Sequence, residues 1–270
     1  MNLLNKNVIL TGASGGIGQA LARQLADQGA CLWLVGRNRS ALQALRASLR
    51  EPGRHTVFCV TEYSDDEIIN LAACFHAGQR LDVLINNADT SRFALLAQQS
   101  FQEIRLQLRV NSEIPLLLTR ALIHHFAAGG VILNVGSVLG ELGHPGYSVY
   151  GATKASMLAF SDALRRELAP SGLSVIYVAP RRLRTALHAG AALAMPHAPG
   201  QRSDEPQEVA VHVMSALLRN RPRSRMGRLE RLFIRLNALL PSVVDYLLQK
   251  KMPAIDRILY SQAKESVQER

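Results

Sequence analysis

The sequence predicts an α/β fold in which a parallel β-sheet lies between two layers of helices. Six apolar runs of strand length alternate with segments of helical period over the first 180 residues. These runs are rich in Val, Ile and Leu and show little alternation, as strands covered on both faces do. The alternation indicates right-handed βαβ units, and therefore a doubly wound parallel sheet of Rossmann type in a three-layer αβα arrangement.

The expected elements follow one another in a regular order. Strands are predicted at residues 7–12, 31–37, 55–61, 81–88, 130–137 and 173–180, and helices at 17–29, 39–51, 66–78, 101–127 and 149–169. Two helices are preceded by the S-x-x-E pattern of a capping box, at 64–67 and 100–103. Residues 188–206 have the composition of a loop or lid, and further helices are expected from Glu205 onward.

The composition indicates a globular protein with anionic partners. The 270 residues are 48% hydrophobic and 19% charged, with no 18-residue apolar run and no signal-peptide pattern. The three cysteines have no C-x-x-C spacing and are interpreted as reduced thiols, so we expect a cytoplasmic protein. The formal net charge of +10 favours nucleic acid, an acidic membrane surface or phosphorylated small molecules as partners.

A glycine-rich turn follows the first expected strand and opens the first expected helix. It reads TGASGGIG at residues 11–18. A pyrophosphate that approaches the unpaired N–H groups of a helix N-terminus needs a tight turn without side chains in its path. We therefore predict a dinucleotide site that includes Gly12, Ser14, Gly16, Ile17 and Gly18.

The end of the second strand predicts which dinucleotide binds. Enzymes that use NAD place an acidic residue there, on the ribose 2′-hydroxyl, whereas this sequence has Gly36 followed by Arg37. An acid would repel a 2′-phosphate, whereas an arginine pairs with it. We therefore expect NADP(H) to be preferred over NAD(H), with Arg37 as the residue that discriminates.

Four polar residues are candidates for catalysis. Tyr150 and Lys154 are four residues apart near the start of an expected helix, so their side chains lie on one face. A nearby ammonium favours phenolate, so we expect Lys154 to lower the pKa of Tyr150 from about 10 toward neutrality. Ser137 ends the preceding strand, where its hydroxyl could hold a substrate oxygen, and Asn111 is polar at a position expected to be buried.

Together these motifs resemble the short-chain dehydrogenase/reductase family. The resemblance covers roughly residues 5–187 and rests on TGASGGIG at 11–18, NNA at 86–88, Asn111, Ser137, Tyr150 and Lys154. It implies that residues 1–200 form an NADP-binding, Rossmann-type catalytic domain. Residues 201–270 are expected to be a helical C-terminal extension that completes the same domain, and no metal is implied.

The resemblance also implies a role for each catalytic residue. In this family the tyrosine exchanges a proton with the substrate oxygen, which the serine orients. The lysine lowers the tyrosine pKa and binds the nicotinamide ribose, and the asparagine bends its helix and holds a water in a proton relay. Hydride passes between nicotinamide C4 and the substrate carbonyl carbon. The alternative is a regulatory protein of this fold that binds NADP(H) without turnover, against which the four intact positions argue.

Cofactor contacts and departures from the family pattern follow from the same comparison. Contacts are implied for Asn87, Ala88, Tyr150, Lys154, Pro180 and Thr185, and the acid that usually contacts adenine corresponds to Glu62, followed by Tyr63. Asp89 replaces the glycine of Asn-Asn-Ala-Gly, and because aspartate tolerates unusual turn conformations we expect only a local adjustment. The arginines at 181, 182 and 184 lie between Pro180 and Thr185, and we hypothesise that at least one contacts the cofactor pyrophosphate or an acidic substrate group.

The expected substrate pocket is mostly apolar, which suits a lipid-like or alicyclic carbonyl or alcohol. Its expected lining is Leu139, Leu142, His144, Tyr147, Leu187 and Met195. Family members are commonly dimers or tetramers, built through the long helices that here bear Asn111 and Tyr150, so a homo-oligomer is expected.

The C-terminal part carries the excess of positive charge. Residues 219–235 hold seven arginines and one glutamate, and apolar helical stretches follow. Nucleic-acid binding is not expected, because the segment lacks interleaved aromatic residues and a known binding module. Two interpretations remain for residues 219–251: helices packed on the domain with a solvated basic face, which we favour, or an amphipathic surface in weak contact with anionic lipid, which would make the protein peripheral to the membrane.

Overall fold

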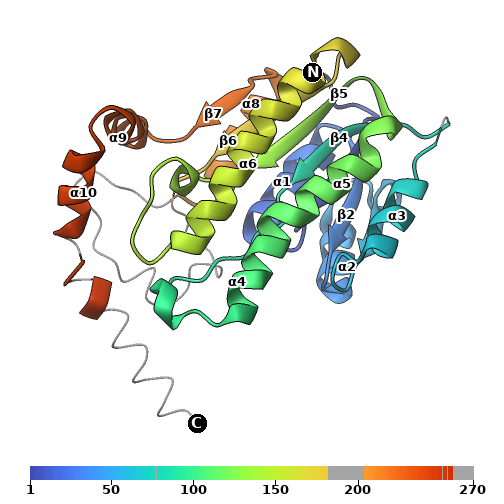
Figure 1. Cartoon of the computed structure of the whole chain (residues 1–270). Helices are drawn as coiled ribbons and strands as arrows, with labels where there is room; N and C mark the ends of the chain where they lie inside the picture. Colours follow the sequence, from blue (N-terminus) through green and yellow to red (C-terminus); the bar gives the residue numbers. More distant parts are fainter. Residues whose placement is uncertain (77, 182–203, 251, 254, 258–270) are drawn as a thin grey trace, which may run out of the picture.

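The computed structural model describes residues 1–76, 78–181, 204–250, 252–253 and 255–257. Within them, one sheet of seven parallel strands has the order β3-β2-β1-β4-β5-β6-β7 (Figure 1). The strands are β1 Asn7–Thr11, β2 Cys31–Gly36, β3 Thr56–Cys59, β4 Leu81–Asn86, β5 Phe126–Val135, β6 Ser174–Ala179 and β7 Arg223–Arg225. From β1 the chain adds β2 and β3 on one side of the sheet and then β4 to β7 on the other, so the strand order reverses between β1 and β4. Ligands of open α/β sheets bind at such a switch point.

Helices cover both faces of the sheet, as the sequence predicts. One layer contains α1 Gly16–Asp27, α2 Arg39–Ser48 and α8 Pro206–Leu218, which pack on one apolar core. The other contains α3 Asp65–Ala73, α4 Phe101–Leu108, α5 Ile114–Leu122 and α6 Ser148–Glu167, which face the viewer in Figure 1. Along β1 the side chains alternate between the cores: Val8 and Leu10 face α1, whereas Ile9 belongs to the core beneath α3, α5 and α6. The predicted three-layer Rossmann-type fold is therefore confirmed.

The long helix expected at 101–127 is divided. A π-helical turn at Arg109–Glu113 separates α4 from α5, α5 ends at Leu122, and β5 begins at Phe126, earlier than expected. Short 3₁₀ turns lie at Pro52–Arg54, Leu96–Gln98, Ile123–His125, Val138–Gly140 and Ala169–Ser171. The π turn contains Asn111, which is 1% exposed, so the interruption sets the position of a candidate site residue.

The C-terminal part joins the same sheet. β7, which was not predicted, pairs with β6 through the register Val178 to Ser224, and α8 packs on α1. Arg223 of β7 forms an ion pair with Asp162 of α6, which fastens this edge strand to the helical layer. Two further helices, α9 Arg228–Leu239 and α10 Pro241–Gln249, lie at one end of the molecule (Figure 1).

No single helix among the described residues has the length and apolar character needed to cross a membrane. The pair α9 and α10 meets that criterion only when taken together, and the two helices are bent by 117° at their junction. Pro241 is the first residue of α10, where its missing N–H and fixed φ are tolerated and the preceding helix ends.

Candidate active site

The glycine turn forms the floor of a large cavity. Gly12 has a left-handed φ of +63°, and a Cβ on Gly18 would lie 2.2 Å from the Gly12 carbonyl oxygen, so larger residues do not fit at either position. The residue before α1 is Gly15, which provides no side-chain cap, and the first turn contains no acidic residue. The free N–H groups of this helix start and its positive dipole end suit a phosphate. The residues present therefore fit a dinucleotide.

Backbone contacts join this turn to the end of β4. The Thr11 hydroxyl accepts hydrogen bonds from the backbone N–H groups of Asn87 and Ala88, at 2.9 and 3.0 Å. A Cβ on Gly12 would lie 2.7 Å from the Ala88 Cα. Asn87 donates from Nδ2 to the Thr11 carbonyl oxygen at 3.0 Å, so the predicted contact residues Asn87 and Ala88 are fixed beside the glycine turn.

Residues that follow β2 and β3 line the far end of the cavity. Arg37 is exposed, lines the cavity together with Ser14, and its guanidinium has no ion-pair partner within the described part of the chain. Glu62 is also exposed and lines the cavity. Tyr63 is buried in a left-handed conformation, with φ of 56°, and burial raises the pKa of its phenol to about 12. The structure therefore places Arg37 and Glu62 around the same cavity.

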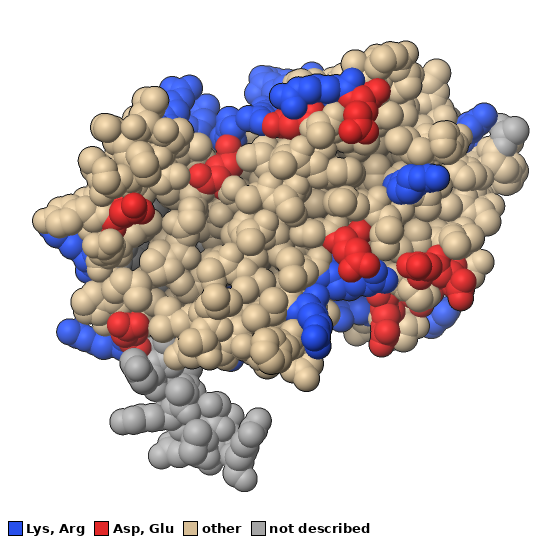
Figure 2. Space-filling model, viewed as in Figure 1, with Lys and Arg blue, Asp and Glu red and all other residues tan. Residues whose placement is uncertain are grey.

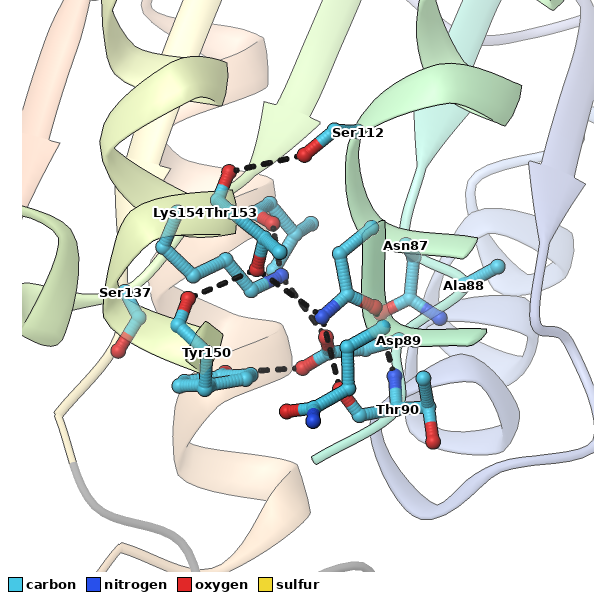
Figure 3. A network of polar contacts seen from close by, with 12 residues as sticks. Asn87, Ala88, Asp89, Thr90, Ser112, Ser137, Tyr150, Thr153 and Lys154 are labelled. Atoms are coloured by element: carbon cyan, nitrogen blue, oxygen red, sulfur yellow. Dashed lines mark hydrogen bonds and ion pairs between the residues drawn. The ribbon is translucent and has the colours of Figure 1, made fainter. Parts of the chain in front are cut away.

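Ser137 and Tyr150 line the same cavity, and Lys154 lies next to Tyr150, with its Nζ 5.5 Å from the centre of the Tyr150 ring (Figure 3). Ser137 follows β5 and is held by the Tyr177 hydroxyl, which accepts from the Ser137 N–H at 3.3 Å and donates to its carbonyl oxygen at 3.2 Å. Tyr150 is 4% exposed and Lys154 is 2% exposed. Lys154 donates from Nζ to the Val135 carbonyl oxygen at 3.3 Å.

Asp89 enters this cluster, which the sequence did not lead us to expect. Tyr150 Oη donates to Asp89 Oδ2 at 2.9 Å, and Lys154 Nζ lies 3.0 Å from Asp89 Oδ1 (Figure 3). Burial raises the pKa of Tyr150 well above its usual value, and the Asp89 charge and hydrogen bond raise it further, whereas Ser137 lowers it. The pKa of Tyr150 is therefore raised in this structure and not lowered as expected, because burial and the Asp89 carboxylate both disfavour the phenolate.

Asn111 connects the π turn to the loop that carries Asp89. Its Oδ1 accepts from the Thr90 N–H at 2.8 Å, and its Nδ2 donates to the Thr90 carbonyl oxygen at 2.7 Å and to Thr153 Oγ1 at 3.1 Å. Three atoms from two elements are thereby fixed by one buried amide. Asn111 thus positions the β4–α4 loop and α6 relative to each other, which is a contact that the resemblance did not imply.

Part of the cavity lining comes from the C-terminal helices. Of the expected pocket residues, Leu139, Leu142, His144 and Tyr147 line the cavity, whereas Leu187 and Met195 lie outside the described residues. The sequence did not predict that α9 and α10 contribute Glu230, Phe233, Ile234, Val244, Leu247 and Leu248. Their amphipathic pattern was the available signal, because such a helix buries its apolar stripe against something.

Pro180 and Arg181 lie at the cavity edge, after β6. Arg181 forms two hydrogen bonds of 2.7 Å with the carboxylate of Asp204, which is 1% exposed. This bidentate pair joins the two chain segments that flank residues 182–203, and it raises the pKa of Arg181. Arg182, Arg184 and Thr185 lie outside the described residues.

The chain is similar to proteins of known sequence and structure. The family model described as short chain dehydrogenase matches residues 6–194. A 3-oxoacyl-acyl-carrier-protein reductase (FabG) of Chlamydia trachomatis is 34% identical over 186 residues, which are 66% of this chain and 74% of that protein. The structure of a short-chain dehydrogenase from Sphingobium yanoikuyae in complex with NADPH has a TM-score of 0.74 at 29% identity and covers 90% of this chain and 95% of its own.

A second solved structure is alike in fold alone. It is a short-chain dehydrogenase/reductase from Burkholderia phymatum in complex with NAD, with a TM-score of 0.78 at 19% identity. The match covers 90% of this chain and 96% of that one. Similar folds therefore occur with either dinucleotide, so the cofactor preference of this chain depends on its own residues.

Proposed function

The chain belongs to the short-chain dehydrogenase/reductase family of oxidoreductases, and we propose that it transfers a hydride between NADPH and the carbonyl or alcohol carbon of an apolar, lipid-like substrate. One observation carries this proposal. Ser137 and Tyr150 line the same cavity as the uncapped glycine turn. The cavity has a volume of about 2410 Å³. A pocket for one small ligand typically has about 300–1,000 Å³, so this cavity is larger. A dinucleotide and a substrate fit together.

The roles proposed for the chain's own residues follow from their geometry. Tyr150 gives its proton to the substrate oxygen in the direction of reduction, and its raised pKa keeps the phenol protonated through neutral pH. Ser137, which the Tyr177 hydroxyl holds in place, donates to the same oxygen and orients it. The cofactor, when bound, supplies the hydride. Lys154 binds the nicotinamide ribose and stabilises the phenolate that proton transfer leaves on Tyr150.

Arg37 is proposed to determine the preference for NADPH. We expect Arg37→Ala to reduce the ratio of kcat/KM for NADPH to that for NADH by about 10- to 100-fold, because one charge-assisted contact with the 2′-phosphate is lost. Steady-state kinetics with both cofactors measure this ratio. Arg39→Ala is the matched control, because Arg39 is also exposed and lines the cavity. Equal use of both cofactors by the unmodified protein contradicts the assignment.

The lining of the cavity supports an apolar substrate. Its apolar members include Leu139, Leu142, Tyr147, Phe233, Ile234, Val244, Leu247 and Leu248, and its polar members include Asp89, His144, Arg181 and Glu230. The similarity to a 3-oxoacyl-acyl-carrier-protein reductase makes β-keto acyl thioesters a first class to assay. Aldehydes, steroids and quinones complete a panel followed by NADPH absorbance. The alternative of a regulatory protein without turnover has no contact in its favour among the described residues.

We propose that the chain forms a homo-oligomer through the α4–α6 face. Figure 2 shows that the centre of this face is largely uncharged. Phe101 is 78% exposed on α4, and α6 presents exposed small residues, Ala152, Ala155 and Ala159, which allow close approach of another helix. Sedimentation velocity is expected to give a dimer or tetramer that Ala155→Glu dissociates. A wild-type protein that sediments as a monomer at micromolar concentration contradicts this proposal.

We propose that α9 and α10 make weak contact with anionic lipid, so that a cytoplasmic protein becomes peripheral to the membrane. Their exposed residues outside the cavity lining include Leu229, Leu232, Leu239, Leu240, Val243 and Tyr246, interspersed with Arg228, Arg231, Arg235 and Lys250. Their inner surface lines the cavity, so a lipid-like substrate could enter directly from the bilayer.

Vesicle sedimentation tests this contact. We expect binding to vesicles that contain phosphatidylglycerol and little binding to phosphatidylcholine alone, with loss of binding at high salt, because the arginines act through a screened surface potential. Leu232→Glu should weaken binding severalfold. Ile69→Glu is the matched control, because Ile69 is equally exposed on α3, at 60% against 60%. Absence of binding at low salt ends the proposal.

A further inference from the structure

Asp89 is a carboxylate at the centre of the candidate active site, where the family pattern has glycine. Its two oxygens contact the two groups that the proposed reaction needs: Oδ2 accepts from Tyr150 Oη at 2.9 Å, and Oδ1 lies 3.0 Å from Lys154 Nζ. The Lys154 side chain is 3% exposed and that of Asp89 is 21% exposed, so the carboxylate lies between the ammonium and the cavity.

The backbone around Asp89 is fixed on both sides. Thr11 holds the N–H of Ala88, and Asn111 holds the N–H and the carbonyl oxygen of Thr90. Asp89 is absent from the described residues with positive φ, so its conformation is one that any residue adopts. Tolerance of an unusual turn conformation, which the sequence suggested for Asp89, is therefore not needed here. What the substitution adds is the carboxylate.

The same carboxylate lies on the path that a dinucleotide must take. Its pyrophosphate fits the uncapped start of α1, and the nicotinamide end must then extend along the cavity past Asp89 toward Ser137 and Tyr150. In the proposed function Lys154 binds the nicotinamide ribose and Tyr150 protonates the substrate oxygen, and Asp89 engages both groups in this structure.

We propose that Asp89 is a positioning residue that competes with the nicotinamide half of the cofactor: in the free protein it holds Tyr150 and Lys154, and it releases both when NADPH binds. This inference rests on the proposed function. Because the substrate oxygen needs Tyr150 Oη, it follows that substrate binds productively only after the cofactor has displaced Asp89. Cofactor binding thereby releases the Tyr150 hydroxyl from Asp89, so that it can donate to the substrate oxygen.

Calorimetric titration with a whole and a half cofactor tests the competition. NADPH reaches Asp89, whereas adenosine 2′,5′-bisphosphate carries the 2′-phosphate but no nicotinamide ribose. We expect Asp89→Gly to lower the Kd of NADPH about tenfold, because charge-assisted contacts no longer have to be broken. Asp89→Asn keeps the shape but removes the charge, so it should lower that Kd by a smaller factor. The Kd of adenosine 2′,5′-bisphosphate should stay within about twofold in both variants, because its site is distant.

Three outcomes overturn the competition. The first is an unchanged Kd of NADPH in Asp89→Gly, and the second is a raised Kd of NADPH. The third is an equal change in Kd for NADPH and adenosine 2′,5′-bisphosphate. Each outcome counts only in a variant whose melting temperature shows that it is folded. If Asp89→Gly does not fold, Asp89→Asn decides in the same way through the two Kd values. A wild-type protein that binds neither ligand contradicts the proposed NADP(H) dependence instead, so the two failures are distinguishable.

Discussion

Tyr150→Phe is expected to lower kcat by about 10²–10⁴ while NADPH still binds, because the variant removes one hydroxyl that gives its proton to the substrate oxygen. The ring remains in place between Tyr147 and Lys154, at a centroid distance of 5.9 Å to the Tyr147 ring, so the cavity keeps its shape. Initial rates of NADPH oxidation measure kcat, and calorimetric titration measures the Kd of NADPH separately.

Tyr246→Phe is the matched control for this substitution. Tyr246 lies on the outer side of α10 and is 59% exposed, so its hydroxyl is remote from the proposed chemistry and its loss should leave kcat unchanged. A Tyr150→Phe protein that turns over at the wild-type rate removes Tyr150 from the mechanism. If Tyr150→Phe loses NADPH binding as well as turnover, the result contradicts a role of the Tyr150 hydroxyl in proton transfer alone.

Lys154→Met is expected to abolish turnover and also to lower the free energy of unfolding by about 2 kcal/mol. Methionine fills a similar volume, but Asp89 then lacks its cation in a largely buried place. The loss should be smaller than for a fully buried pair, because 21% of the Asp89 side chain is exposed. Urea denaturation followed by circular dichroism measures the stability, and NADPH oxidation measures turnover.

A second substitution separates the ion pair from the packing of the lysine stem. In the double variant Lys154→Met, Asp89→Asn the uncompensated charge is removed, so we expect part of the lost stability to return. Turnover should not return, because the group that stabilises the phenolate of Tyr150 is still missing. If the double variant is less stable than Lys154→Met alone, the ion pair is not what the lysine contributes.

Most of the fold could be predicted because its signals are local. The apolar runs, the two capping boxes and the glycine turn each lie within a few residues of chain, and all six predicted strands are present. β7 could not be predicted, because the residues Arg-Ser-Arg pair with β6 only through tertiary contacts. The π turn around Asn111 was implied only as a bend by the family resemblance.

The identity of the site residues could be predicted from the sequence motifs. Properties that depend on neighbours in space, such as the pKa of Tyr150, could not. Ser137, Tyr150 and the glycine turn are brought together around one cavity, as the spacing of the motifs suggested. The pKa of Tyr150 was expected to be lowered, because the sequence pairs it with Lys154 alone. Its rise depends on burial and on Asp89, a residue 61 positions away whose side-chain direction no local pattern reveals. The cavity wall from α9 and α10 was missed because an amphipathic pattern does not reveal which surface the apolar stripe of a helix packs against.

Transfer of deuterium tests the central claim most directly. The protein would be supplied with NADPH that carries deuterium at both C4 positions of the nicotinamide and with the best carbonyl substrate from the panel, and the alcohol product would be analysed by mass spectrometry. We predict one deuterium on the carbinol carbon for the wild type, and about 10²–10⁴-fold slower formation of labelled product with Tyr150→Phe. An alcohol without label, or equal labelled product from Tyr150→Phe, would contradict hydride transfer at this site.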